Sequence, residues 1–467
     1  MAFRIALPKG RLLKETSALL EKSGWKIEGY NTQMRHYRLL SKKYPEMGIK
    51  VFQEKDIPIQ VAVGNYDIGI CGLNWIEELL VKYPSSAIDK ILDLGYGEGA
   101  LFAAMRPEMM RGTGTIIRIA SEYSNLAESF AERLRLKRFS ILPLWGAAEV
   151  YPPESAEIVL LTGKTEKDLV KHKLVNLSLL VKTKAYLIAN KNSLKKKDMT
   201  QILAALTKNV PHGIHEIDEI NNIPVIVRAV GINAGKQNAN DKVRIALPDG
   251  HQQSHVCSIF KQAGIYVHDY PSKTGNRRPV SNIEGILIKV IRPQDMPLQV
   301  ANDNFDLAIT GRDWFTEHKY QFPSSPVVEL VDLKYGRVRL VAVISKDMPA
   351  ENIDEWQRNR HQSHSACRVA SEYTNIADNY ARDKRLGRYR IIPTWGATEA
   401  FLPEDADILI ENTETGGTIA RHNLKIIDTL FESTVCLIGS KRIIYDKIKQ
   451  KRVKRIIEAL ESAVGAN

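Results

Sequence analysis

Short apolar runs alternate with amphipathic segments along the whole chain. Residues 4–7 form a compact apolar run that predicts a β-strand, and residues 12–23 place apolar side chains at helical spacing before Gly24 ends the pattern. Further strands are expected around Val51 and at residues 68–70. Alternating strands and helices are typical of α/β folds with mostly parallel sheets, which bind ligands at the carboxyl ends of their strands.

The second half of the chain repeats the first. The sequence Arg-Ile-Ala-Leu-Pro occurs at residues 4–8 and again at 244–248, and a longer match begins at Arg118 and returns at Arg368. Solenoid repeats are only about 20–50 residues long, so this pattern indicates tandem duplication of a whole domain. The offset rises from 240 at the first match to 250 at the last, which places the extra residues around 347–365.

Two copies and a linker therefore divide the chain. We expect residues 1–210 to form copy one, residues 211–242 a polar, glycine-bearing linker, and residues 243–467 copy two. The predicted fold class is α/β in two tandem copies, with mixed, mostly parallel sheets flanked by helices.

Composition narrows the class of partner. Hydrophobic residues make up 44% of the 467 residues and charged residues 26%, as in soluble globular proteins. No apolar run approaches the roughly 20 residues that cross a bilayer, and a strand pattern begins at once in place of a signal peptide, so we expect a cytoplasmic protein without membrane contact. Four well-separated cysteines predict no metal site. The net charge of +12 is dispersed, which favours anionic metabolites over nucleic acid.

The clearest candidate for chemistry lies at residues 407–418. A short apolar strand is expected to end at Glu411, and Thr415, Gly416, Gly417 and Thr418 follow. Adjacent glycines let backbone N–H groups point at an anion, threonine hydroxyls donate to phosphate oxygens, and Glu411 is suited to ribose hydroxyls or a metal. The alternative interpretation is an ordinary strand-to-helix turn with a threonine cap.

Four motifs occur elsewhere in the chain and, with this loop, make a set of five. They are Leu-Pro-Lys-Gly-Arg at 7–11, Arg-Pro-Gln-Asp-x-Pro at 292–297, Asp-Leu-x-Ile-Thr-Gly-x-Asp at 306–313, Asp-Leu-x-x-Gly-x-x-x-Leu at 332–340, and residues 406–418. In this order they resemble the short form of ATP phosphoribosyltransferase, the first enzyme of histidine biosynthesis. The resemblance implies two lobes per copy, similar to periplasmic binding proteins, with the active site in the cleft between them. Two copies in one chain depart from the family and indicate an internal pseudo-dimer, with further homo-oligomerisation left open.

The resemblance also implies a reaction and roles. A ring nitrogen of ATP attacks phosphoribosyl pyrophosphate and pyrophosphate leaves, with Mg²⁺ accompanying the phosphoribosyl pyrophosphate. Arg292, Arg337 and Arg339 are assigned to pyrophosphate, residues 415–418 to the 5′-phosphate and Glu411 to the ribose. Weaker candidates for ATP or its triphosphate are Asp313, Lys9 and Arg11. Arg277 and Arg278 lie in a stretch where the family places a phosphate-binding arginine, with a solvated turn as the alternative, and Glu399 stands at the glutamate of the family's Gly-Ser-Val-Glu motif. The open alternatives are another heterocyclic acceptor, or a non-catalytic regulatory protein that binds nucleotides.

The two copies differ at the predicted phosphate-binding positions. Copy one has Leu161, Glu166 and Lys167 opposite Glu411 and the two glycines, and Gln53, Glu98 and Ala100 opposite the three arginines. We therefore expect copy one not to bind phosphoribosyl pyrophosphate.

At the Leu-Pro-Lys-Gly-Arg motif the basic residues are in copy one and not in copy two. Copy one keeps Lys9 and Arg11 where copy two has Asp249 and His251, and a carboxylate beside a polyphosphate is unfavourable. Either copy one completes a composite site, or copy two takes an acceptor less anionic than ATP.

Overall fold

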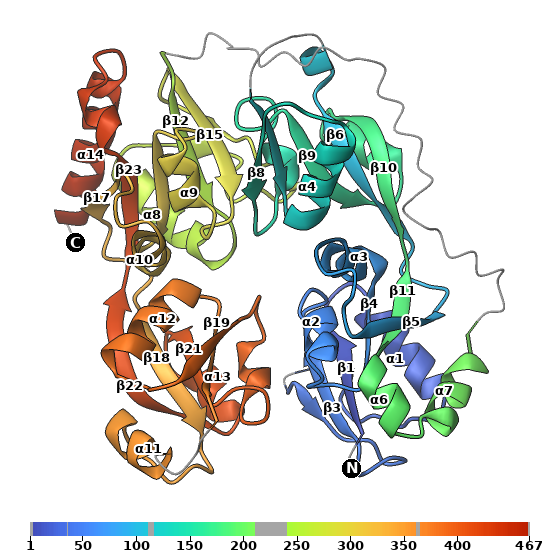
Figure 1. Ribbon diagram of the computed structural model, residues 1–467. Coiled ribbons are helices and arrows are strands. Elements are labelled where there is room, and N and C mark those ends of the chain that lie inside the picture. Colours follow the sequence, from blue (N-terminus) through green and yellow to red (C-terminus); the bar gives the residue numbers. More distant parts are fainter. Residues whose placement is uncertain (1–2, 35, 111–115, 211–240, 361–364, 466–467) are drawn as a thin grey trace. The chain divides into compact units, whose positions relative to one another are not determined.

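The chain separates into two compact units, each of which takes in a short segment from the other copy. The computed structural model describes residues 3–34, 36–110, 116–210, 241–360 and 365–465 (Figure 1). Unit 1 comprises Met1–Pro143, Ala156–Asn233 and Thr394–Asp405, and unit 2 comprises Leu144–Ser155, Ala234–Pro393 and Ala406–Asn467. Residues 211–240 of the predicted linker lie outside the described residues, so the domain boundaries stay predictions.

The first lobe of unit 1 is a six-stranded sheet in the order β2-β3-β1-β4-β11-β5. Its strands are β1 (Arg4–Pro8), β2 (Arg38–Leu39), β3 (Gly48–Phe52), β4 (Ile68–Gly72), β5 (Ile88–Asp93) and β11 (Ala185–Asn190). The helices of this lobe are α1 (Leu13–Lys22), α2 (Ile57–Ala62), α3 (Leu73–Lys82), α6 (Lys191–Lys196) and α7 (Thr200–Thr207). The predicted first strand and the predicted first helix are thereby confirmed.

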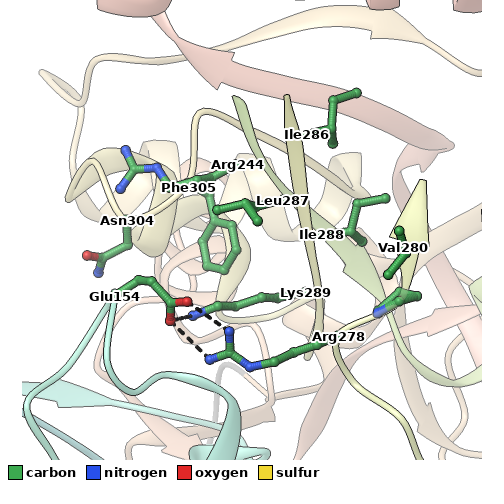
Figure 2. Close-up of a pocket in the computed structure, with 11 residues that line it drawn as sticks. Glu154, Arg244, Arg278, Val280, Ile286, Leu287, Ile288, Lys289, Asn304 and Phe305 are labelled. Carbon is green, nitrogen blue, oxygen red and sulfur yellow. Dashed lines mark hydrogen bonds and ion pairs between the residues drawn. The ribbon is translucent and has the colours of Figure 1, made fainter. Parts of the chain in front are cut away.

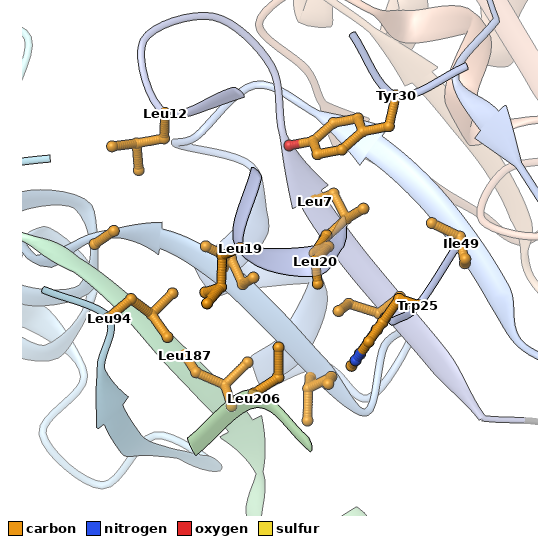
Figure 3. Packing of buried hydrophobic residues seen from close by; sticks show 14 of the residues in the cluster. Leu7, Leu12, Leu19, Leu20, Trp25, Tyr30, Ile49, Leu94, Leu187 and Leu206 are labelled. Atoms are coloured by element: carbon orange, nitrogen blue, oxygen red, sulfur yellow. The ribbon is translucent and has the colours of Figure 1, made fainter. Parts of the chain in front are cut away.

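Both faces of this sheet are covered. On one face Leu7 of β1, Leu19 of α1 and Leu206 of α7 belong to a buried core around the fully buried Trp25 (Figure 3). On β4, Gly69 allows α2 to come close, because a Cβ at this position would lie 2.5 Å from the side chain of Ile57. On β4, Ile68 and Ile70 face the core around Trp25, whereas Gly69 between them faces α2, so alternate residues of this strand contact helices on opposite faces of the sheet.

The second lobe of unit 1 is a five-stranded sheet in the order β10-β6-β9-β7-β8. Its strands are β6 (Gly99–Met105), β7 (Ile117–Ser121), β8 (Phe139–Pro143), β9 (Ile158–Gly163) and β10 (Val175–Thr183). Its helices are α4 (Ser124–Arg133) and α5 (Glu166–Lys171), together with the short 3₁₀ helix η1 (Pro107–Met110).

Unit 2 repeats this two-lobed plan with the sheets β15-β12-β16-β23-β17 and β20-β19-β21-β18-β22. The first lobe contains β12 (Val243–Pro248), β15 (Ile286–Ile291), β16 (Leu307–Gly311), β17 (Val327–Asp332), β23 (Val435–Ser440), the pair β13 (Val267–His268) and β14 (Val280–Ser281), and helices α8 (Gln253–Gln262), α9 (Met296–Ala301), α10 (Arg312–Gln321) and α14 (Gln450–Gly465). The second lobe contains β18 (Val338–Ser345), β19 (Cys367–Ser371), β20 (Tyr389–Pro393), β21 (Ile408–Thr413), β22 (Leu424–Ser433), and helices α11 (Ile353–Arg360), α12 (Thr374–Asp383) and α13 (Gly417–Arg421).

The sheets are mixed, as predicted, but parallel pairs do not predominate. In each described five-stranded sheet two neighbouring pairs are parallel and two antiparallel. In the first-lobe sheets the reason is that β11 and β23 return the chain from the second lobe and lie antiparallel to their neighbours. In the second-lobe sheets β6 and β18 lie antiparallel to both of their neighbours. The extra residues predicted in copy two include helix α11, which buries Ile353 and Trp356 in the core of its lobe.

No helix in the described part of the chain is both long enough and apolar enough to cross a membrane. The cytoplasmic location stays a prediction.

A buried histidine makes unit 2 sensitive to acid. His318 of α10 is buried and lies 2.7 Å from Ser325 Oγ through its Nε2, and burial lowers the pKa of His318 to about 4. The pKa of a histidine in the unfolded chain is about 6.5, whereas that of His318 in the folded protein is about 4. Between these pH values the unfolded state therefore binds one more proton than the folded state. The contribution of His318 to the free energy of unfolding is therefore lost as the pH falls from about 6.5 to 4.

We expect His318→Leu, which installs the side chain that copy one carries at Leu79, to flatten this pH dependence. Urea unfolding of both proteins at several pH values between 7 and 4 measures it. An equally steep loss of stability in the variant would contradict the assignment, whatever its absolute stability.

Candidate functional site

The loop that follows β21 is held in one conformation by its own threonines. Gly416 N donates to Thr413 Oγ1 at 2.9 Å, and Gly417 N donates to Thr415 Oγ1 at 3.4 Å. Gly416 has a φ of +78°, and a Cβ there would meet nothing within 4 Å, so the backbone angle rather than space requires glycine. The strand runs to Thr413, so Glu411 lies inside the strand and not at its end as predicted.

The alternative interpretation of the copy-two loop is a strand-to-helix turn capped by threonine, and such a turn occurs in copy one. Thr165 caps α5 in a capping box with Asp168, whereas the residue that caps α13 in copy two is Gly416. Asp168 Oδ2 accepts from Lys164 N at 2.9 Å and from Thr165 N at 3.2 Å, and Lys171 Nζ lies 2.6 Å from Oδ1. These bonds lower the pKa of Asp168 to about 2. In copy one a carboxylate with a lowered pKa therefore stands at the position of Thr418, where it would repel a bound anion.

Two of the predicted arginines lie near the copy-two loop, in the same sheet or at its edge. Arg339 of β18 is the direct antiparallel neighbour of Thr413 on β21, so their side chains share one face of the sheet. Arg337 precedes β18 and forms a 3.5 Å ion pair with Glu432, and both partners are more than half exposed. Such exposed pairs contribute little to stability, so Arg337 is available to an anionic ligand.

The third arginine lies in the first lobe of unit 2. Arg292 follows β15 and its guanidinium is 3.2 Å from Asp249, which lies 3.2 Å from Arg277 as well. Arg277 also pairs with Glu149 at 3.1 Å. Asp249, expected to be unfavourable for an anion, is thus neutralised by two arginines.

Glu149 is a residue that the sequence did not single out. It comes from copy one, in the Leu144–Ser155 segment of unit 2, and is the counterpart of Glu399 at an offset of 250. Glu399 itself belongs to unit 1, in Thr394–Asp405. The repeat carried this signal, but nothing in the sequence showed that the two copies exchange these segments.

A buried hydrogen-bond chain joins the two lobes of unit 2. Tyr373 Oη donates to Asp313 Oδ2 at 2.7 Å and accepts from Asn412 Nδ2 at 2.7 Å. Asp313 is almost fully buried, and this burial raises the pKa of its carboxyl group. The predicted role of Asp313 toward ATP is untested, but its carboxylate is engaged inside the protein. Asn412 adjoins Glu411, so the chain anchors the strand that leads to the loop.

The remaining candidates lie in unit 1. Arg11 pairs with Glu54 at 3.1 Å, and Lys9 donates to Tyr37 Oη at 2.5 Å. The structure thus groups the loop, Glu411, the three arginines and Asp313 in unit 2, and places Lys9, Arg11 and Glu399 in unit 1.

These observations define a two-lobed α/β protein in which one of the two copies carries a loop of threonines and glycines after its strand β21. The family model HisG, ATP phosphoribosyltransferase, matches residues 53–208 and 292–462. The chain therefore belongs to the ATP phosphoribosyltransferase family, carries its domain twice, and is a transferase of the pentosyl-transfer class.

Relatives of known name agree with this assignment. The ATP phosphoribosyltransferase of Thermodesulfovibrio yellowstonii is 28% identical over 230 residues, which span 48% of this chain and 73% of the relative. That of Desulfatibacillum aliphaticivorans is 30% identical over 234 residues, which span 48% and 74%. Among solved structures, the ATP phosphoribosyl transferase (HisG:HisZ) complex from Thermotoga maritima matches 48% of this chain and 100% of that chain, with 20% identity and a TM-score of 0.39.

A matched pair of substitutions tests the loop. Asn and Asp both tolerate the left-handed backbone of Gly416, but only Asp adds a negative charge beside a bound phosphate. We expect Gly416→Asp to weaken the binding of phosphoribosyl pyrophosphate by roughly tenfold or more, since like charges in contact cost several kcal/mol, and Gly416→Asn to weaken it much less. Isothermal titration calorimetry measures both affinities, and equal losses in the two variants would argue against a phosphate at this loop.

Proposed function

We propose that unit 2 transfers the ribosyl 5-phosphate group of phosphoribosyl pyrophosphate to a ring nitrogen of ATP with release of pyrophosphate, the first step of histidine biosynthesis. The observation that carries the proposal is the contrast between the two loops. In copy two the N–H groups of Gly416 and Gly417 are held by threonine hydroxyls, which can rotate away. Copy one has Glu166 and Lys167 in place of these glycines, and Asp168, which accepts from the N–H groups of Lys164 and Thr165, puts a fixed negative charge at the position of Thr418. Only the copy-two loop suits a phosphate.

The 5′-phosphate would bind the loop in a simple exchange. Its oxygens accept from Gly416 N and Gly417 N, while the hydroxyls of Thr415 and Thr418 turn to donate to the same phosphate. Glu411 then accepts from the ribose hydroxyls. Because Asn412 is tied to the Tyr373 hydroxyl at 2.7 Å, the strand that carries Glu411 is fixed before the substrate arrives. Such pre-organisation holds the anomeric carbon in position for attack.

The leaving pyrophosphate is assigned to the three arginines. Displacement at an anomeric carbon develops positive charge on the sugar and negative charge on the leaving group, so fixed cations aimed at the leaving group lower the barrier. Arg337 and Arg339 approach from the loop's own lobe and Arg292 from the other. Mg²⁺ would enter with the substrate, bound to its pyrophosphate. Proteins usually hold such an ion through one or two carboxylates in addition to the substrate phosphates, and Glu411 could supply one of them.

The identity of the acceptor has a second candidate. In copy two Asp249 replaces the lysine of copy one, and it engages both Arg277 and Arg292. Because Asp249 offsets the positive charge of these two arginines, the site offers less net positive charge to a triphosphate than a lysine there would, which favours a heterocyclic acceptor with less negative charge. Further assembly of the fused chain stays a prediction.

A pyrophosphate-release assay tests the proposal, with ATP first, then AMP, adenosine and free purine and pyrimidine bases as acceptors. We expect Arg292→Ala to lower kcat/KM by about 10²–10³-fold, as removal of a charge-stabilising donor does, and Gln53→Ala at the copy-one counterpart to change it less than about twofold. Full turnover in Arg292→Ala would overturn the site assignment. Turnover with a base but not with ATP would select the second candidate, and binding of phosphoribosyl pyrophosphate without turnover on any acceptor would indicate a nucleotide sensor.

A further inference from the structure

The exchanged segments build corresponding ion-pair sites in the two units. In unit 1, Lys50 Nζ lies 2.7 Å from Glu404 and 3.0 Å from Asp405, and Tyr66 Oη donates to Asp405 at 2.8 Å. Arg38 also pairs with Glu404. Two cations therefore face two carboxylates, and the tyrosine hydroxyl supplies a further donor to Asp405.

Unit 2 keeps half of this arrangement. Lys289, the counterpart of Lys50, lies 2.8 Å from Glu154, and Arg278 binds Glu154 through both guanidinium nitrogens at 2.8 and 3.0 Å. The repeat places Ser155 where unit 1 has Asp405, and Phe305 where it has Tyr66. Ser155 is fully buried, and its Oγ has no hydrogen-bond partner within the described residues.

Unit 2 is consequently one carboxylate short. Two cations, Arg278 and Lys289, share the single carboxylate of Glu154, although only 7% of the Lys289 side chain is exposed. The next ion pairs do not restore the balance. Asp306 is already paired with two cations, Arg244 and Lys449, whereas its unit 1 counterpart Asp67 pairs with Lys197 and accepts from the backbone N–H of Arg4. Burial and the nearby Arg278 lower the pKa of Lys289 to about 7, which reflects this shortage.

A cavity of about 290 Å³ opens at this place. Its walls are mostly apolar, and Glu154, Arg278 and Lys289 lie together beside the ring of Phe305 (Figure 2). Arg244, whose charge is paired with Asp306, and Asn304 make up the rest of the polar lining. The apolar lining residues are Pro279, Val280, Ile286, Leu287, Ile288 and Phe305. An apolar wall with a few convergent polar groups is the usual form of a small-molecule site, and this volume lies at the lower end of the range.

We propose that this cavity binds a small monocarboxylic acid with an apolar body, whose carboxylate supplies Lys289 with the partner that Asp405 gives Lys50 in unit 1. One negative charge restores the balance between the cations and Glu154. A dianion such as inorganic phosphate would exceed it and would face apolar walls, which favours a monocarboxylate. The site is independent of the proposed transfer reaction. Arg278, which lies in the stretch where the family places a phosphate-binding arginine, is bound to Glu154 here, and no other lining residue is a candidate for phosphoribosyl pyrophosphate.

The test uses 3-phenylpropionate as the probe and 3-phenylpropanamide as its neutral match, both titrated calorimetrically into the full chain. We expect the acid to bind at one site per chain and the amide at least about tenfold more weakly, since the desolvated charge pair distinguishes them. No binding of the acid at millimolar concentration, or equal binding of acid and amide, would overturn the proposal.

The two copies offer matched variants for this experiment. Phe305→Tyr with Ser155→Asp installs the unit 1 arrangement, and we expect it to abolish binding of the acid while pyrophosphate release stays unchanged. Tyr66→Phe with Asp405→Ser makes the reverse change, and we expect a second site per chain. Lys289→Met should weaken binding by about tenfold or more, and where it impairs folding, the two double variants decide. Unaltered binding in the first double variant would place the probe elsewhere and refute the assignment.

Discussion

The hydrogen bond between Tyr373 and Asp313 is the constraint on which unit 2 depends. It joins the second lobe to the first, and through Asn412 it fixes the strand that carries Glu411 and leads to the anion loop. Copy one has the same connection, with Asn74 donating to the hydroxyl of Tyr123 at 2.7 Å. Such a hydrogen bond holds the two lobes of a unit together whether or not the loop binds a ligand, because leaving a buried hydroxyl without a partner is energetically costly.

This separation of scaffold from chemistry explains how the two copies could diverge. The copy-one loop has become a capped helix start in which Asp168 satisfies the backbone donors from within. Copy one nevertheless supplies Leu144–Ser155 to unit 2, where Tyr151 is fully buried and Trp145 N donates to Asp295 at 3.0 Å. Copy one is therefore part of the packing of unit 2.

Much of the fold could be predicted from the sequence. The duplication, the first strand and helix and the position of the extra helix α11 all follow from repeated motifs and local periodicity, which are properties of neighbouring residues. The proportion of parallel pairs could not be predicted, because β11 and β23 enter the first sheet from the opposite lobe. The sequence predicts that the strand ends at Glu411, but the strand continues to Thr413. The local sequence could not show this, because the strand boundary depends on pairing with β18, which is distant in sequence.

The sequence by itself determined the family, the loop at residues 415–418 and the loss of its glycines in copy one, since these depend on residue types at fixed spacing. Only the tertiary structure decided which residues share a unit. It placed Glu399 in unit 1 and Glu149 beside Arg277 in unit 2, and it turned Asp249 from an unfavourable charge into the partner of two arginines. The physical reason is that these ion pairs join residues between 28 and 128 positions apart, and no local pattern records such contacts.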